Sequence, residues 1–236
     1  VDGLDVVVVQ NTFPDKKIVE LLLILQAVKE AGAKTVTCVI PYMGYSRQER
    51  IFQAGEARSA KAIAGVIGSM CDRIFTINVH TPAVLDFFGC EAQDINGFRE
   101  VVRYLKGFKP DMVVAPDEGS KDRCTLAANM LKVPVHVMKK VRIDGRTVET
   151  TSGPVEVKGC TAVILDDIIS TGGTIATAAN ILRNGGTDRI LAACTHGLFI
   201  EDAANRLRVC DDIMSSDTLE GVYTRFSVAP AIANAL

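Results

Sequence analysis

The sequence predicts an α/β fold of two similar halves, each a mainly parallel sheet flanked by helices. Apolar runs of strand length alternate with segments whose apolar residues recur at helical spacing, which is typical of parallel sheets covered by helices. Segments 29–44 and 183–198 also share one order of helix end, glycine, charged residue and apolar strand, which indicates a weak internal repeat. With 236 residues, of which 48% are hydrophobic, the chain can bury such a core.

The first half opens with a β-α-β unit. The run "DVVVVQ" is typical of a buried parallel strand, and Gly32 stops the helix that follows it. Farther along, Thr81 is expected to cap a short helix that has Pro82 in its first turn. The predicted strands are 5–10, 35–40 and 73–79, and the predicted helices are 18–28, 58–70 and 81–88.

The second half continues the alternation and adds a hairpin that turns at Asp144–Gly145. No linker rich in proline, glycine and serine marks a boundary, and segment 151–159 comes closest to a junction. With the hairpin assigned to the second half, we expect domains of residues 1–139 and 140–236. The predicted strands here are 111–116, 133–138, 161–167 and 189–195, and the predicted helices are 120–131 and 175–182.

Composition excludes several classes of protein. The formal net charge is −2 and the basic residues are scattered, so nucleic acid is not an expected partner. A membrane is not an expected partner either, because no apolar run reaches the roughly 18 residues that a membrane-spanning helix needs. The seven cysteines form no close CxxC pair, which favours a reducing cytoplasm in which they pack as small apolar residues. The missing methionine indicates a natural N-terminus upstream of Val1.

The segment "DDIISTGGT", residues 166–174, carries the clearest chemistry. It joins an apolar strand to a helix, so its glycines allow backbone N–H groups to face an anion at the positive end of the helix. The P-loop lysine is absent, and a monophosphate therefore suits the loop better than a triphosphate. The two carboxylates can accept hydrogen bonds from sugar hydroxyls or engage Mg²⁺. The alternative, that these residues merely cap a helix, requires only one of them.

This segment resembles the phosphoribosyl diphosphate binding loop shared by type I phosphoribosyltransferases and ribose-phosphate diphosphokinases. The resemblance implies two type I phosphoribosyltransferase-like halves, with ATP and metal on the first and ribose 5-phosphate on the second. It also implies that the ribose 5-phosphate site consists of Asp166, Asp167, Ser170, Thr171, Gly172, Gly173 and Thr174.

Segment 41–50, "PYMGYSRQER", follows a predicted strand and concentrates guanidinium groups beside two tyrosines. Guanidinium groups bind phosphate in a fork and stack on adenine, although a solvated charged turn explains the composition equally well. The stretch is similar to the "PYxxYxRQ" segment of the diphosphokinases, which lies along the ATP. This likeness implies that Arg47 and Gln48 bind ATP.

Two further segments suggest metal ligands. His80 stands at a strand end, where a lone histidine is more often structural, and Asp117 precedes a helix, where an acid can serve only the helix dipole. The first segment resembles the family's "DLHxxQIxGFF", with Asn78 where many members have Asp, and the second resembles "PDxG". The resemblance implies that His80 and Asp117 bind Mg²⁺.

The predicted hairpin carries a run of basic residues, which is usually just solvated surface. It resembles the family's mobile "KxR" flap, which closes over the triphosphate. In this register, the likeness assigns Lys140 and Arg142 as the catalytic residues that stabilise charge on the reacting phosphates.

The resemblance extends over nearly the whole chain, through "THxxF" at His196, which we interpret as structural, to "SVAP" near the end. Two differences stand out. Ser170 replaces an aspartate common in bacterial members, and the family's "FxDGE" element, which reaches into a neighbouring subunit, would lie upstream of Val1. The family implies a homo-oligomer whose active site is shared between subunits.

The activity implied is transfer of the β,γ-diphosphoryl group of ATP to the C1 hydroxyl of ribose 5-phosphate, which gives phosphoribosyl diphosphate and AMP. A phosphoribosyltransferase would use the same loop but would leave Arg47, Gln48 and His80 without a role. A catalytically silent paralogue that binds partner synthetases, or a ligand-sensing regulator, would not require Lys140, Arg142 and His80.

Overall fold

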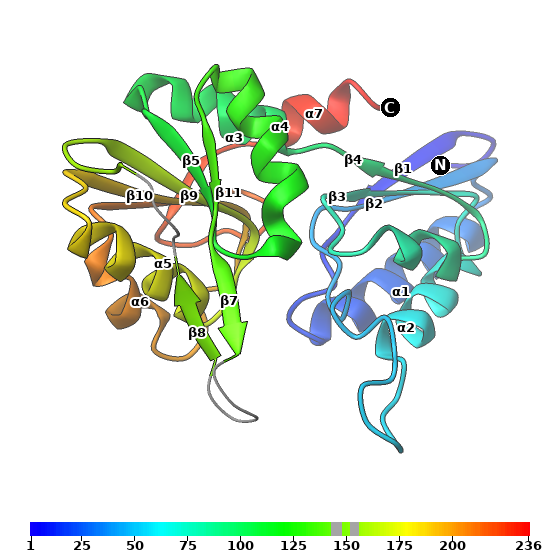
Figure 1. Ribbon diagram of the computed structural model, residues 1–236. Coiled ribbons are helices and arrows are strands. Elements are labelled where there is room, and N and C mark those ends of the chain that lie inside the picture. The colour runs from blue at the N-terminus through cyan, green and yellow to red at the C-terminus, as the bar shows by residue number, and fades with distance from the viewer. Residues whose placement is uncertain (143–147, 152–155) are drawn as a thin grey trace. The chain divides into compact units, whose positions relative to one another are not determined.

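A four-stranded parallel sheet organises the first compact unit, residues Val1–Asn96 with Ala231–Leu236. The computed structural model describes residues 1–142, 148–151 and 156–236 (Figure 1). Apolar side chains of two α-helices and a short 3₁₀ helix, among them Leu21, Leu25 and Ile67, pack against one face of this sheet. The strands, in spatial order, are β1 (Asp5–Val9), β2 (Thr35–Ile40), β3 (Arg73–Ile77) and β4 (Glu91–Ile95), and the helices are α1 (Lys16–Glu30), α2 (Ser59–Gly68) and η1 (Pro82–Phe87).

The second unit, Gly97–Pro230, contains a six-stranded parallel sheet in the order β12-β11-β10-β9-β5-β6. The strands in chain order are β5 (Met112–Ala115), β6 (Val135–Val137), β9 (Thr161–Ile169), β10 (Arg189–Gly197), β11 (Asp212–Ser216) and β12 (Thr224–Phe226). Strand β9 lies near the middle and is apolar on both faces up to Leu165, as expected of a strand covered from two sides.

Helices cover both faces of this sheet (Figure 1). On one face α3 (Phe98–Leu105) and α4 (Lys121–Leu131) pack against Val163 and Leu165 of β9. On the other face α5 (Gly173–Asn184) packs against Ile164. The remaining helices are η2 (Lys106–Phe108), η3 (Glu118–Ser120), α6 (Ala203–Arg206), η4 (Leu207–Val209) and α7 (Ala229–Ala233).

The predicted hairpin is present as an antiparallel pair, β7 (Lys139–Arg142) with β8 (Val148–Thr151). Lys140 pairs with Thr150 and Arg142 with Val148 in its register. The turn predicted at Asp144–Gly145 lies outside the described residues.

The expected boundary between residues 139 and 140 differs from the observed division. The two units separate after Asn96, because β5 and β6 join β9 in one sheet instead of completing the first unit.

The helix cap expected at Thr81 is wrong in detail. Thr81 precedes a 3₁₀ helix and its side chain makes no capping hydrogen bond, although Pro82 does occupy the first turn.

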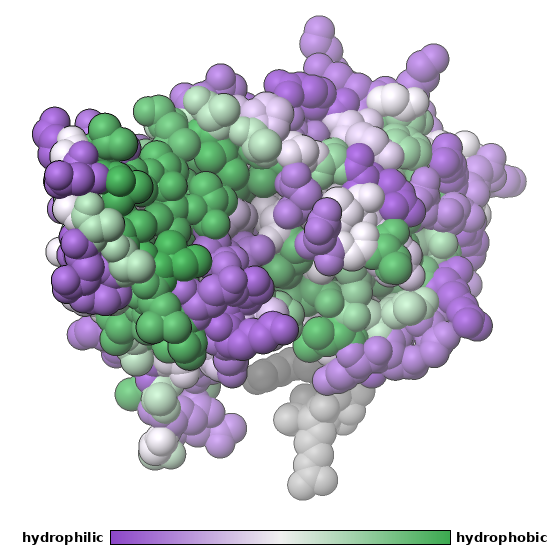
Figure 2. Space-filling model, turned by 180° about the vertical axis from the view of Figure 1, so that it is seen from behind, coloured by the Kyte–Doolittle hydropathy of each residue, from purple (hydrophilic) through white to green (hydrophobic). Residues whose placement is uncertain are grey.

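Hydrophobic side chains remain exposed on the first unit. They come from β1, at the edge of its sheet, and from α1, and Figure 2 shows hydrophobic residues gathered over this part of the molecule. The exposed members are Val7, Val9, Val19, Leu23 and Ile24.

The cysteines are free thiols, and Cys38, Cys71, Cys124, Cys194 and Cys210 are buried, as expected for small apolar side chains. Within the described ranges, no helix is both long and apolar enough to cross a membrane.

Candidate functional site

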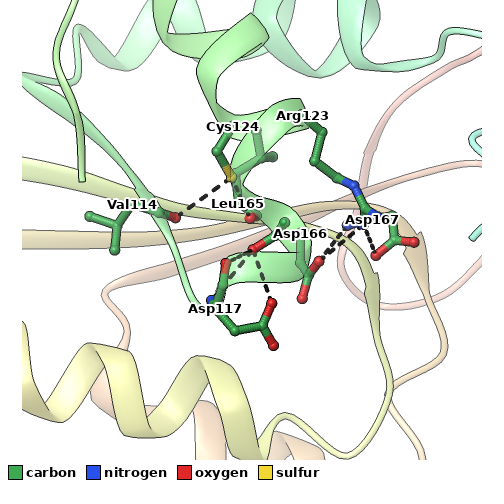
Figure 3. Close-up of polar contacts among 8 residues, drawn as sticks. Val114, Asp117, Arg123, Cys124, Leu165, Asp166 and Asp167 are labelled. Carbon is green, nitrogen blue, oxygen red and sulfur yellow. Dashed lines mark hydrogen bonds and ion pairs between the residues drawn. The ribbon is translucent and has the colours of Figure 1, made fainter. Parts of the chain in front are cut away.

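The candidate site lies at the carboxyl ends of β5 and β9, which are neighbours in the six-stranded sheet. From β5 the chain steps outward to β6, and from β9 it steps in the opposite direction to β10. Ligands of open α/β sheets bind where the strand order reverses in this way. Asp117 follows β5 and Asp166 lies near the end of β9, so the topology places both acids at this edge (Figure 3).

The two acids of β9 share one arginine that the sequence did not reveal. Arg123, in the first turn of α4, places its Nη1 atom 2.5 Å from Asp167 Oδ1 and 3.5 Å from Asp166 Oδ1 (Figure 3). The backbone N–H of Asp167 also donates to Asp166 Oδ1 at 2.9 Å. The side chain of Asp167 is 5% exposed and that of Asp166 is 18% exposed, so Asp166 is the more accessible carboxylate.

Burial and like charge act together on Asp166. Burial, followed by the neighbouring Asp167 charge, raises the pKa of Asp166 well above its ordinary value, and Arg123 only partly opposes this. Burial also disfavours the charge on Arg123, but the two carboxylates outweigh it and raise the pKa of Arg123. The cluster therefore holds two acids and one firmly charged base in a partly desolvated position.

The loop that follows β9 delivers the chain to the start of α5. Gly172 precedes the first helical residue with φ +74°, a backbone conformation that favours glycine. A Cβ atom at this position would lie 3.0 Å from the Leu207 side chain, so Leu207 would have to shift to admit one. The first backbone N–H groups of an α-helix have no acceptor within the helix, which makes the Gly173–Asn184 helix start suitable for an anion.

Segments from elsewhere in the unit hold this loop in shape. The N–H groups of Leu198 and Phe199 donate to the Ile169 carbonyl at 2.9 and 3.2 Å. The N–H of Ile200 donates to the Ser170 carbonyl at 3.2 Å. These contacts give the "THGLF" stretch a structural part in the site, because it fixes the residues just ahead of Thr171.

His196 belongs to this stretch and is buried. Its Nδ1 atom lies 2.9 Å from the Thr218 hydroxyl, which itself donates to the Thr195 carbonyl at 3.0 Å. Ser216 donates to the same carbonyl at 2.7 Å. The buried position agrees with the structural interpretation of His196.

Asp117 begins the short η3 helix in a capping box with Ser120. The Ser120 hydroxyl contacts Asp117 Oδ1 at 3.4 Å and donates to the Asp117 carbonyl at 2.9 Å. Asp117 therefore has a structural part at the helix start, where the alternative to metal binding was a role toward the helix dipole alone. Capping does not exclude a metal role, since an ionised carboxylate offers about four lone pairs.

The expected ATP-binding residues belong to the first unit. Arg47 is exposed, whereas Gln48 helps to shape the loop that follows it. Glu56 Oε2 accepts hydrogen bonds from the backbone N–H groups of Phe52 and Gln53 at 2.9 and 3.0 Å, and from Gln48 Nε2 at 3.2 Å. One carboxylate thus organises the loop beside Arg47.

His80 is half-buried ahead of η1 in the same unit, whereas Asp117 belongs to the second unit. The two expected metal ligands therefore come from different units. Lys140 and Arg142 lie on β7, and their side chains lie outside what the structure describes.

Comparison with known proteins identifies the family. The family model for the N-terminal domain of ribose phosphate pyrophosphokinase matches residues 1–70, and the model for the phosphoribosyl transferase domain matches residues 93–227. Ribose-phosphate pyrophosphokinase from Methanopyrus kandleri is 36% identical over 238 residues, which cover 98% of this chain and 82% of that protein. The chain belongs to the ribose-phosphate pyrophosphokinase family.

Other relatives agree with this membership. Ribose-phosphate pyrophosphokinase from Methanosarcina mazei is 38% identical over 235 residues, which cover 98% of this chain and 78% of that protein. The crystal structure of phosphoribosylpyrophosphate synthetase from Mycobacterium smegmatis aligns with a TM-score of 0.84 and 29% identity, over 100% of this chain and 82% of that one. The resemblance to ribose-phosphate diphosphokinases, another name for this family, and the α/β fold of two parallel sheets are thereby confirmed.

Proposed function

We propose that this protein transfers the β,γ-diphosphoryl group of ATP to the C1 hydroxyl of ribose 5-phosphate. The observation that carries the proposal is the placement of Asp166, Asp167 and the glycine loop at the switch point of the sheet, in a member of the ribose-phosphate pyrophosphokinase family. The reaction requires two anionic substrates to be held in line while their charge is neutralised.

The second unit would hold the sugar phosphate. The N–H groups and hydroxyls of residues 170–174 would bind the 5-phosphate at the start of α5. Asp166 would accept hydrogen bonds from the ribose hydroxyls. Asp167 would support it through the backbone N–H that donates to Asp166 Oδ1. Ribose 5-phosphate carries both groups that these residues suit, a diol for the carboxylate acceptor and a phosphate for the N–H donors.

Arg47 and Gln48 would hold the nucleotide on the loop that Glu56 organises. Lys140 and Arg142 would act mostly in the transition state, where charge develops on the bridging and transferred oxygens. Cationic donors that meet this charge accelerate phosphoryl transfer without taking part covalently.

Mg²⁺ is the proposed cofactor, held by His80 and Asp117. Among the described residues, no group of three or more His, Cys, Asp or Glu side chains could hold a metal ion alone. The single carboxylate of Asp117 fits Mg²⁺ carried by ATP, because this ion keeps waters and phosphate oxygens and takes only one or two protein carboxylates. When bound, the ion would neutralise phosphate charge.

A homo-oligomer in the cytoplasm is the proposed state of the protein. The exposed hydrophobic residues of β1 and α1 support association, since large exposed apolar areas often mark protein interfaces. The formal net charge of −2 gives no reason to expect nucleic acid as a partner.

The deciding experiment measures AMP formation from ATP and ribose 5-phosphate in the presence of Mg²⁺. In parallel, diphosphate release from phosphoribosyl diphosphate is followed with a panel of purine and pyrimidine bases. AMP formation that depends on both substrates supports the proposal. Diphosphate release with a base, without AMP formation, would identify a phosphoribosyltransferase instead.

A further inference from the structure

We propose that Arg123 is a positioning residue that anchors Asp167 and thereby presents Asp166 to the ribose hydroxyls. The inference rests on the proposed function and extends it, because it gives the two neighbouring carboxylates different tasks. Asp167 is the buried anchor and Asp166 is the group that meets the sugar.

The first step of the argument is the burial of the ion pair. The Arg123 side chain is 22% exposed and its Nη1 atom lies 2.5 Å from an Asp167 carboxylate that is 5% exposed. A charged pair in this position is costly to break, because removal of one partner leaves the other charge desolvated and unpaired. Arg123 therefore fixes the conformation of Asp167.

The second step is the rigidity of the helix that carries Arg123. The next residue, Cys124, is fully buried and its Sγ atom lies 3.1 Å from the Leu165 carbonyl of β9. Ala127 and Ala128 of the same helix pack into the core with Val163. The guanidinium thus approaches β9 from a helix that is itself held to that strand two residues before Asp167.

The third step connects the anchor to the accessible acid. The backbone N–H of Asp167 donates to Asp166 Oδ1 at 2.9 Å, and Arg123 Nη1 lies 3.5 Å from the same oxygen. Asp166 Oδ1 is therefore engaged from within the protein, which leaves Oδ2 as the oxygen to accept from substrate. If Asp167 changed its conformation, the orientation of the Asp166 carboxylate would change as well.

The positive charge of Arg123 also affects whether Asp166 and Asp167 are ionised. Two adjacent carboxylates without a cation disfavour joint ionisation, and one of them would then carry a proton. A protonated carboxyl donates through that hydrogen instead of accepting from a hydroxyl at that oxygen. Arg123 favours the ionised form of both carboxylates, so it opposes the burial and the like charge that hold a proton on Asp166.

The test compares Arg123→Gln, Arg123→Lys, Asp167→Asn and the double variant Arg123→Gln/Asp167→Asn. Calorimetry measures the binding of ribose 5-phosphate without ATP, and steady-state kinetics give KM for each substrate. Arg123→Gln is expected to weaken ribose 5-phosphate binding about 10- to 100-fold, by analogy with the loss of a residue that orients a metal ligand. KM for ATP should change by less than about threefold, and Arg123→Lys should recover part of the loss.

The double variant separates positioning from a direct role. If Arg123 acts through Asp167, the two substitutions affect the same interaction and their combined effect should be close to that of the larger single effect. Effects that multiply in full would overturn the inference. So would ribose 5-phosphate binding by a folded Arg123→Gln protein within about twofold of the wild type.

Arg183→Gln is the matched control. Arg183 pairs with Asp211 at 2.7 Å in the same unit. It lies in the last turn of α5, at the opposite end of that helix from the proposed site residues Gly173 and Thr174. Its loss should lower the melting temperature and leave ribose 5-phosphate binding unchanged. If Arg123→Gln does not fold, Arg123→Lys and Asp167→Asn decide the matter, and unaltered binding by both would refute the inference. A wild-type protein that does not bind ribose 5-phosphate would refute the proposed function instead.

Discussion

The backbone N–H of Asp167 donates a 2.9 Å hydrogen bond to the carboxylate of Asp166, so two acids next to each other in sequence are also coupled in space. Burial, followed by the Asp167 charge, raises the pKa of Asp166 well above its ordinary value. A carboxyl group with a raised pKa in the folded state binds its proton more tightly there than in the unfolded chain. Its ionisation therefore lowers the free energy of unfolding as pH rises from the unfolded pKa to the folded pKa.

Asp166→Asn should consequently make the protein more stable and less active. At pH values where Asp166 is ionised, the melting temperature should rise by about 2–4 °C, the shift that 1 kcal/mol produces in a chain of this size. The turnover of ATP and ribose 5-phosphate should fall about 10²-fold or more, because an amide accepts more weakly from the sugar hydroxyls. Differential scanning fluorimetry and the AMP assay provide the measurements.

The control for this prediction is Asp211→Asn, because the pKa of Asp211 shifts in the opposite direction. Burial acts to raise it, but the Ile190 N–H at 2.7 Å and Arg183 at 2.7 Å together lower the pKa of Asp211. The contribution of Asp211 to stability is present above its unfolded pKa and is lost on acidification. Asp211→Asn should thus lower the melting temperature slightly at neutral pH, and a rise in both variants would contradict the assignment of opposite shifts.

Gly172→Ala should damage the phosphate loop, while Gly173→Ala should not. Gly172 has φ +74° and an added Cβ would lie 3.0 Å from Leu207, whereas a Cβ on Gly173 would meet only the Thr171 hydroxyl at 3.9 Å. The strained backbone alone costs about 1–3 kcal/mol. Calorimetry should show ribose 5-phosphate binding weakened at least tenfold in Gly172→Ala and nearly unchanged in Gly173→Ala. Equal losses in the two variants would mean that the backbone conformation at Gly172 is unimportant.

The candidate phosphate loop stands out in the sequence because its signal is local. Aspartates, hydroxyl residues and glycines stand within nine consecutive positions between a strand and a helix, so one stretch contains the pattern. Arg123 could not be found in this way. Its partner Asp167 lies in another element, and any of the 26 lysines and arginines could have balanced the charge.

The observed division into units differs from the expected one for a related reason. Periodicity identified the strands β5, β6 and β9 but says nothing about which strands pair across a long connection. Because β5 pairs with β9, the helix that carries Arg123 belongs to the same unit as Asp167. The short, partly polar strands β4 and β12 were missed, since neither shows a continuous apolar run.

Lys140→Ala should reduce turnover about 10²-fold with smaller effects on the apparent affinity for either substrate. A donor that meets charge only as the transition state forms contributes to kcat more than to KM. Lys158→Ala, which removes an exposed lysine after the hairpin, is the control and should retain normal kinetics. Near-normal turnover in Lys140→Ala would remove Lys140 from the mechanism.

Glu56→Ala should affect the nucleotide side alone. The Glu56 carboxylate accepts three hydrogen bonds, from Gln48, Phe52 and Gln53. Its loss should therefore loosen the loop beside Arg47. KM for ATP should rise about tenfold, which corresponds to about 1.4 kcal/mol. Ribose 5-phosphate binding measured by calorimetry should not change. Glu30→Ala is the matched control, because Glu30 is an exposed acid whose Oε1 accepts from Gln26 at 2.9 Å on α1.

Leu23→Asp should lower the mass of the assembly. Leu23 is 66% exposed on α1 and lies one helical turn from exposed Val19, so the two form part of one apolar surface. If a second copy of the chain covers this surface, a buried carboxylate there would be unpaired and association would weaken. Size-exclusion chromatography with light scattering should then show a smaller species, and activity should fall on dilution if the active site is shared. Leu126→Asp, at an exposed leucine of α4, should leave the mass unchanged. A Leu23→Asp protein with the wild-type mass would show that this surface is not where the copies meet.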